Sequence, residues 1–171
     1  GLQTGPSVQG AALGNDSSFV SLKLSSDLLN GQSYSLSAIN QTDLFGNVSS
    51  SLSSPFQVRI SEAASFQDII INEFMADPSP PVSLPEVEYV ELYNRSNKFI
   101  NLNSWEFSDA SSTVRLDDYW FESNTYLILC DPTDSSLLSA YGTILSVSGL
   151  PSLNNTGDLI KLEDSSATVI D

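Results

Sequence analysis

Apolar and polar side chains alternate along this chain, and this two-residue period is the feature that most restricts its fold. In residues 19–24 the alternation places Val20, Leu22 and Leu24 on one face of an extended segment. Successive side chains of a β-strand point to opposite faces, so the pattern predicts strands with one buried face. No helical period competes with it in residues 1–60. We therefore predict an all-β fold without a long helix.

Two further runs, Ile69–Phe74 and Glu88–Ser96, organise the rest of the chain. Both read as strands that are largely apolar on both faces but carry carboxylates and amides among the apolar residues. The residues expected to share a face are Ile69, Ile71 and Glu73 in the first run, and Glu88, Val90 and Leu92 in the second. This composition suits strands inside a β-sandwich whose polar groups hold loops or edges.

Residues 1–60 contain short strand candidates at 19–24, 34–39 and 55–60, with Asn30-Gly31 as the turn of a hairpin between the first two. Residues 30–47, which end in the loop Asp43-Leu-Phe-Gly-Asn47, resemble the final half of a bacterial immunoglobulin-like (Ig-like) domain. The opening strands of such a domain are missing. Either the sequence begins inside the domain, or a partner supplies the missing edge. We therefore expect an incomplete first module with an exposed strand edge, followed by a polar linker at 61–68.

Four motifs in residues 69–171 occur in the order found in the lamin-tail domain. They are Ile71-Asn-Glu73, Glu88-Tyr-Val-Glu-Leu-Tyr-Asn-Arg-Ser96, Leu102-Asn-Ser-Trp105 and Leu153-Asn-Asn-Thr-Gly-Asp158. Residues 69–171 thus resemble that family, which implies an Ig-like β-sandwich. The whole chain is expected to form two consecutive Ig-like modules, of which the first is incomplete.

Within these motifs we expect structural roles. Trp105 should be a buried anchor of the sandwich, and Gly157, with Asn155 as a second candidate, should adopt a positive φ angle in a turn before Asp158. The carboxylates of Glu73, Glu88 and Glu91 should accept backbone hydrogen bonds or pair with Arg95 or Arg115. The remaining motif residues, with the same structural expectation, are Asn72 and Asn94.

Composition argues against catalysis. The chain has no His, which removes the commonest general base, and its single Cys130 excludes an internal disulfide and a cysteine-based zinc site. We expect a buried, inert thiol at Cys130. Glu88 and Glu91 are separated by an odd number of positions, so only Glu73 with one of them could form a carboxylate pair for glycoside hydrolysis. We therefore expect no catalytic residues and no enzyme activity.

The 171 residues include 6 Lys and Arg against 21 Asp and Glu, a formal net charge of −15. Such a surface repels phosphate backbones, so nucleic acid is not expected as a partner. The apolar runs are too short to span a membrane.

The segment Asp117-Asp-Tyr-Trp120 combines two carboxylates with two aromatic rings and is the candidate ligand-binding site. With Phe121 and Tyr126, its rings could form a platform that stacks on a sugar, with the bland alternative that Trp120 points inward while Tyr119 and Phe121 cover a sheet edge. No cofactor is expected by default, and calcium is the leading candidate if there is one. Its candidate ligands are loop aspartates, among them Asp43, Asp77, Asp109, Asp117, Asp118, Asp131, Asp134, Asp158 and Asp164.

The resemblance to lamin-tail domains of secreted bacterial proteins implies a non-enzymatic module for adhesion, spacing or attachment in a larger secreted protein. The expected location is extracellular or at the cell surface, with the periplasm as another candidate, and the expected partner is a protein or glycan at the cell surface. The alternative is an accessory module of a secreted hydrolase that binds carbohydrate or calcium.

Overall fold

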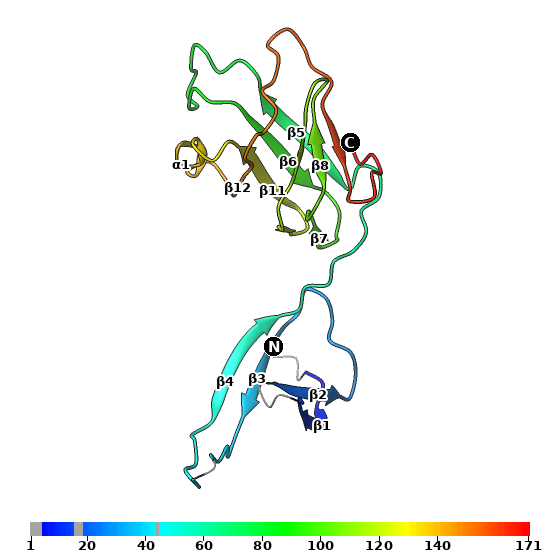
Figure 1. Cartoon of the computed structure of the whole chain (residues 1–171), viewed down its shortest axis with the longest axis vertical. Helices are drawn as coiled ribbons and strands as arrows, with labels where there is room; N and C mark the ends of the chain where they lie inside the picture. The colour runs from blue at the N-terminus through cyan, green and yellow to red at the C-terminus, as the bar shows by residue number, and fades with distance from the viewer. Residues whose placement is uncertain (1–4, 16–18, 44) are drawn as a thin grey trace. The chain divides into compact units, whose positions relative to one another are not determined.

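The structure is a computed structural model that describes residues 5–15, 19–43 and 45–171. The chain divides into two compact units, Gly1–Ile60 and Ser61–Asp171, which are described separately. Strands predominate in both, and the only helix among the described residues is the single turn α1 (Ser135–Leu138) (Figure 1). The fold is therefore all-β, as expected. No helix of the described chain has the length and apolar composition needed to span a membrane.

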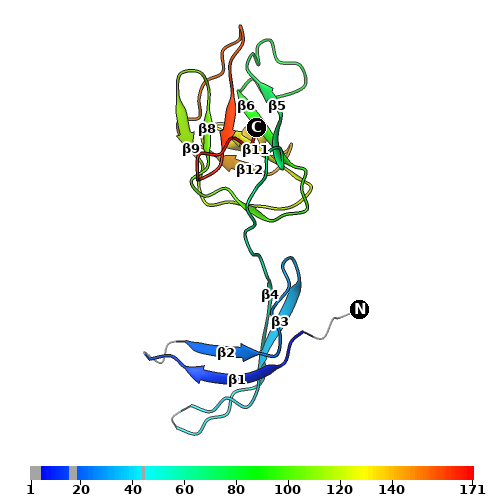
Figure 2. The ribbon, with the colours of Figure 1, turned by 90° about the vertical axis from the view of Figure 1, so that its right-hand side faces the viewer.

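The described part of the first unit contains four strands in two antiparallel ladders. The strands are β1 (Val8–Leu13), β2 (Val20–Leu24), β3 (Ser33–Ala38) and β4 (Leu52–Gln57). β1 pairs with β2, and β3 pairs with β4 in an unbroken register from Ser33 opposite Gln57 to Ala38 opposite Leu52. Figure 2 shows that the two ladders run in different directions.

The expected hairpin at Asn30-Gly31 is not formed, because β2 and β3 pair with other strands. Gly31 does adopt a positive φ of 75°. The turn, however, is fastened to the end of the unit: the Asn30 side chain accepts a hydrogen bond from the Ile60 amide at 2.7 Å and donates one to the Ile60 carbonyl at 3.0 Å. The last strand also ends at Gln57 rather than Ile60.

The Asp43–Asn47 loop between β3 and β4 is closed by its own polar groups. The Asp43 carboxylate accepts hydrogen bonds from the Phe45 amide, the Asn47 amide and the Asn47 side chain at 2.7–2.9 Å. Gly46 supplies the positive φ of 85° that the tight turn requires. The acid, glycine and amide of this motif are thus explained by turn geometry alone.

The second unit is an Ig-like β-sandwich. One sheet has the order β12-β11-β6-β5, a second has the order β13-β8-β9, and β10 pairs with β7. Its strands are β5 (Ile69–Met75), β6 (Tyr89–Asn94), β7 (Ile100–Asn101), β8 (Glu106–Ser108), β9 (Thr113–Arg115), β10 (Trp120–Phe121), β11 (Thr125–Cys130), β12 (Ile144–Ser146) and β13 (Lys161–Glu163).

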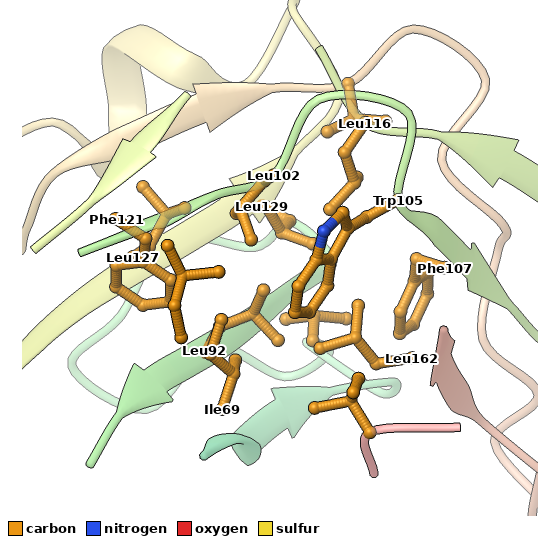
Figure 3. Close-up of a cluster of buried hydrophobic side chains, with 14 of the residues drawn as sticks. Ile69, Leu92, Leu102, Trp105, Phe107, Leu116, Phe121, Leu127, Leu129 and Leu162 are labelled. Atoms are coloured by element: carbon orange, nitrogen blue, oxygen red, sulfur yellow. The ribbon is translucent and has the colours of Figure 1, made fainter. Parts of the chain in front are cut away.

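The core lies between these sheets. Trp105 is only 3% exposed, as expected, and packs among fully buried residues such as Leu92, Phe107, Leu129 and Leu162 (Figure 3). Alternation explains this core, since inward residues of β6 and β11 line one sheet while Phe107 and Leu162, which face each other in the register, line the other. Burying a large aromatic side chain of this kind stabilises the fold by about 2–3 kcal/mol.

The strand β5 departs from the expected alternation at a bulge. Ile71 pairs with Leu92 and Glu73 pairs with Glu91, so Asn72 is the extra residue between them. A bulge adds one residue to one strand and shifts all later side chains to the opposite face. Glu73 therefore lies on the outer face with Glu91, and not on the face of Ile69 and Ile71.

A second, smaller cluster covers part of the outer face of the four-stranded sheet. Tyr89, Ile128, Cys130 and Leu138 of α1 are its buried members. Cys130 has no exposed surface, and burial raises the pKa of its thiol, which agrees with the expected inert cysteine.

Residues 61–68 differ from the expected linker because they are held on the second unit. The Glu62 amide donates to the Phe99 carbonyl at 2.9 Å, and the Gln67 amide donates to the Ile170 carbonyl at 2.8 Å. Lys98 Nζ donates to Ala63 O at 3.0 Å, and it lies 2.6 Å from a carboxylate oxygen of Asp68.

Candidate functional site

Asn94, at the end of β6, is fully buried and fixes two neighbouring segments. Its Nδ2 donates to the carbonyls of Lys98 at 3.0 Å and Phe121 at 3.1 Å. Its Oδ1 accepts from the amide and the hydroxyl of Ser96 at 3.1 and 2.7 Å. The side chain thus uses donors and acceptors together, and it gives the carbonyls of Lys98 and Phe121 a hydrogen-bond donor.

Glu88 lies just before β6 and holds a loop that is distant in sequence. Its carboxylate accepts from the Ser152 hydroxyl at 3.1 Å and the Leu153 amide at 3.1 Å. These bonds place the 152–153 segment beside β6 and bury Leu153 to 4% exposure. Of the two expected kinds of partner, Glu88 has the backbone amide. Arg115 pairs with Glu106 instead.

Asp158 closes the Asn154–Gly157 turn. Its carboxylate accepts from the Asn154 amide and side chain at 3.2 and 3.0 Å, and from the Ala110 amide at 3.3 Å. These donors, led by the Asn154 amide, lower the pKa of Asp158 below its usual value. Gly157 has a φ of 123°, as expected, whereas Asn155 is exposed and is not among the residues with positive φ.

Glu73 and Glu91 lie opposite each other on the outer face of the four-stranded sheet. Each accepts one side-chain hydrogen bond at 2.8 Å, Glu73 from the Tyr89 hydroxyl and Glu91 from the Asn72 amide. Burial, followed by the bond to Glu73, raises the pKa of Tyr89 to about 12. The two carboxylates are thus brought together, and a neighbouring donor holds each of them.

The same outer face carries an aromatic pair that the sequence analysis did not identify. Tyr93 and Tyr126 are register partners on β6 and β11, and their rings stack with centroids 4.4 Å apart and planes 22° apart. β5 borders β6 on the edge away from β11, and its residue Ile70 is the register partner of Tyr93 there. Tyr126 is 50% exposed, and β12 pairs only with residues 128–130, so it does not extend to this ring.

Alternation could have placed both tyrosines on outward positions, because each is next to an inward leucine of its strand, Leu92 or Leu127. The pairing of β6 with β11 was the missing information. We define the outer tyrosine face as Ile70, Glu91, Tyr93 and Tyr126.

The structure separates the four residues of the predicted ligand site. Tyr119 packs against the core, and its ring makes an edge contact with the Phe121 ring, with the ring centroids 6.2 Å apart. These contacts remove the Tyr119 ring from a surface platform. Trp120 is half-buried in β10. Asp118 is exposed but accepts a hydrogen bond from Asn101 Nδ2 at 2.7 Å, and Asp117 is exposed. What remains at the surface is one partly covered indole and two acids.

Several loop aspartates considered for calcium serve turns. Asp109 and Asp131 accept from amides two residues further on, those of Ser111 at 2.7 Å and Thr133 at 2.9 Å, and Asp164 accepts from the Ser166 amide at 2.8 Å. These bonds lower the pKa of Asp109 and Asp131. Among the described residues no three His, Cys, Asp or Glu side chains are grouped to hold a metal ion. Calcium binding stays a prediction.

Comparison with known proteins gives one match. The family model described as Lamin Tail Domain matches residues 62–171, which is more than half of the chain and begins within the segment that hydrogen-bonds to the sandwich. Neither the curated proteins nor the solved structures gave a match.

Proposed function

Because the chain belongs to the lamin tail domain family, we propose that it is a non-enzymatic module for attachment, spacing or adhesion in a larger secreted bacterial protein. Its place is outside the cell or on the cell surface, with the periplasm as the other compartment outside the cytoplasm. Its partners are a protein or a glycan at that surface.

One observation carries the proposal: the polar side chains of the family motifs are used to hold the sandwich together. Asn94, Glu88 and Asp158 each fix a loop through two or more hydrogen bonds. A catalytic carboxylate pair needs one acid with a raised pKa beside one ionised group in a substrate cleft. Here Glu88 and Asp158 anchor loops, and Glu73 and Glu91, which do lie opposite each other, each accept a hydrogen bond from a neighbouring side chain on the outer face of a sheet. This arrangement suits a rigid module better than a catalyst.

Charge supports the choice of partner. Residues 61–171 hold 4 basic and 18 acidic residues, a formal net charge of −14. This unit repels nucleic acid and anionic lipid, so a neutral glycan or a protein surface fits it better.

The outer tyrosine face favours a second function, that of a carbohydrate-binding accessory module. A half-exposed ring stacked on a second ring offers a rigid apolar face for the C–H groups of a sugar, and Glu91 beside it can accept hydroxyl hydrogen bonds. The Asp117–Trp120 segment is the weaker platform, because Tyr119 packs against the core.

Titration of the chain with a panel of neutral glycans tests both functions. The spacer and protein-adhesion function predicts no response from the unmodified chain. The carbohydrate function predicts binding that Tyr126→Ala abolishes. Tyr141→Ala is the matched control, since Tyr141 is 53% exposed and lies outside this face. Trp120→Ala tests the second platform in the same assay.

Two further measurements address chemistry and compartment. Incubation with glycan and phosphoester substrates should give no turnover, and hydrolysis of any of them would overturn the non-enzymatic assignment. Antibody labelling of the producing cells should detect the chain outside the cytoplasm. A cytoplasmic antigen would contradict the proposed location.

A further inference from the structure

Two carboxylates on the outer face of the four-stranded sheet stand opposite each other without a cation between them. Glu73 of β5 and Glu91 of β6 are register partners. The ion pairs described in this unit use the carboxylates of Asp68, Glu106 and Glu163 instead. Like charges directly opposite each other on neighbouring strands destabilise a sheet. The fold thus keeps a repulsive pair that a bound positive group would neutralise.

Both carboxylates are held in position, and each keeps one oxygen for a ligand. Oε1 of Glu91 accepts from the Asn72 side-chain amide, and Oε1 of Glu73 accepts from the Tyr89 hydroxyl, each at 2.8 Å. Oε2 of either residue accepts none of the hydrogen bonds found among the described residues. Glu73 is exposed and Glu91 is half-buried, so solvent or a ligand reaches both.

An aromatic surface lies beside this acidic pair. Glu91 and Tyr93 are two positions apart on β6, so they share the outer face and are separated by roughly 6.6 Å along the strand. Tyr126 stacks on Tyr93 and is 50% exposed. The face of an aromatic ring attracts cations as well as apolar groups. A ligand with a flat apolar surface and a positive charge would therefore use both features together.

Four kinds of ligand can be compared on this basis. A metal ion lacks ligands here, since no third acidic side chain joins the pair among the described residues. A neutral sugar stacks on a ring but leaves the two carboxylates uncompensated. An arginine is planar and positive, but it sits on a flexible stem whose ordering costs entropy. An amino sugar carries its ammonium group on a rigid ring, so one residue can stack and reach a carboxylate.

We propose that the outer tyrosine face, together with Glu73, binds glycans built from amino sugars with free ammonium groups. The sugar ring stacks on Tyr126, and its ammonium group donates to Oε2 of Glu91 while it neutralises the repulsion from Glu73. This inference rests on the carbohydrate-binding function proposed above and names its ligand class. The formal net charge of −14 on residues 61–171 adds long-range attraction to such a glycan.

Isothermal titration of the full 171-residue chain with a matched pair of glycans tests the proposal. The pair is a β-1,4-linked glucosamine hexamer and its fully N-acetylated counterpart, which has the same rings and linkages but no charge. At about pH 5.5 glucosamine is protonated and ordinary carboxyl groups are ionised. The glucosamine hexamer should bind about tenfold more tightly or better. Equal affinities would overturn this inference and leave the neutral-glycan function standing, whereas no binding of either hexamer would overturn both.

Substitutions separate a site from general charge attraction. Glu91→Gln keeps an acceptor for the Asn72 amide and removes the charge, so it should weaken binding of the glucosamine hexamer about tenfold and leave the N-acetylated hexamer unaffected. Glu86→Gln is the matched control, because Glu86 is exposed, lies outside the outer tyrosine face and loses the same charge. Binding by this control should be unchanged. Equal losses in the two variants would show that only the net charge attracts the glycan, and would overturn the proposal.

A hexaarginine peptide tests the competing ligand on the unmodified chain. It carries the same number of charges as the glucosamine hexamer but has no sugar ring, so it should bind about tenfold more weakly. Equal or tighter binding of the peptide would assign the face to arginines of a protein partner and overturn the proposal.

Discussion

Asn94 illustrates how single residues of the family motif act. It is fully buried and takes part in four hydrogen bonds that join the end of β6 to Ser96, Lys98 and Phe121. An amide is suited to this position because it donates to two carbonyls and accepts from an amide and a hydroxyl at the same time. A carboxylate could not donate, and a buried charge would need a partner.

Replacing Asn94 by Ala should therefore destabilise the second unit by about 2–3 kcal/mol, because buried carbonyls lose their donors. Denaturant unfolding measured by tryptophan fluorescence reports this directly, since both tryptophans lie in the second unit. Asn97→Ala is the control: Asn97 is exposed, and its one described side-chain bond, to Asn124, is 3.5 Å long. The control variant should lose less than about 0.5 kcal/mol of unfolding free energy. An equally small loss in the Asn94 variant would refute the role of Asn94.

Tyr89 predicts a change of stability at high pH. Its pKa is about 12 in the folded chain because burial and the Glu73 hydrogen bond disfavour the phenolate, whereas the unfolded value is near 10. A raised pKa means that the stabilisation is complete below about pH 10 and is lost as pH rises toward 12. The free energy of unfolding should fall by roughly 2 kcal/mol across that window through this residue.

Comparing the chain with Tyr89→Phe isolates the effect from the other groups that titrate at high pH. The variant keeps the ring but has no hydroxyl to ionise, so its stability should decline less between pH 10 and 12. Equal slopes for the two proteins would contradict the assignment to Tyr89.

Sequence alone predicts part of this residue-scale behaviour. Burial of Trp105 follows from its place in a lamin-tail motif, and burial of Cys130 follows from the apolar run that it ends. The outward position of Glu73 does not, because the bulge at Asn72 adds one residue that no local pattern marks.

At the scale of elements, alternation identifies strands better than it identifies their partners. β5 and β6 lie close to the expected runs. The parallel pairing of β11 with β12 and the separate ladders of β2 and β3 were not foreseen, since partner choice depends on contacts distant in sequence. For the same reason the sequence did not predict the pairing of Tyr93 with Tyr126. It predicted a ligand-binding site at Asp117–Trp120 instead, because these residues are consecutive in the chain.

Lys98 holds part of the segment 61–68, which the sequence predicts to be a linker. Its ammonium group contacts Ala63 O, Ser65 Oγ at 3.1 Å and the Asp68 carboxylate, so it holds residues 63–68 on the sandwich. Burial raises the pKa of Asp68, but Lys98 and the Ser65 amide outweigh it, and the net pKa is lowered.

Lys98→Met keeps the apolar stem and removes the charge, so it should release this segment and cost about 1 kcal/mol. Phe66 is 68% exposed, and chymotrypsin cleavage after it should accelerate in the variant. Lys161→Met removes a lysine paired with Glu163 elsewhere and should leave cleavage after Phe66 unchanged. Equal cleavage rates for the Lys98 variant and the unmodified chain would show that other contacts hold the segment.

At the scale of the whole molecule, the charge is distributed unequally between the units. The second unit, residues 61–171, carries −14 of the −15 charges. The composition gives the total net charge, and the boundary after Ile60 assigns nearly all of it to the second unit. A compact unit with this excess is destabilised by its own repulsion, which relaxes when the chain expands on unfolding.

Salt should therefore stabilise the second unit. Raising NaCl from about 0.01 M to 0.1 M shortens the Debye length from about 30 Å to about 10 Å, so repulsion between carboxylates across the unit is screened. The thermal midpoint, followed by tryptophan fluorescence, should rise by a few degrees. Glu86 and Asp117 are exposed, so Glu86→Lys with Asp117→Lys should raise the midpoint at low salt and reduce its dependence on NaCl. A midpoint that is independent of salt, or that falls, would mean that local pairs such as Lys98–Asp68 already compensate the excess charge.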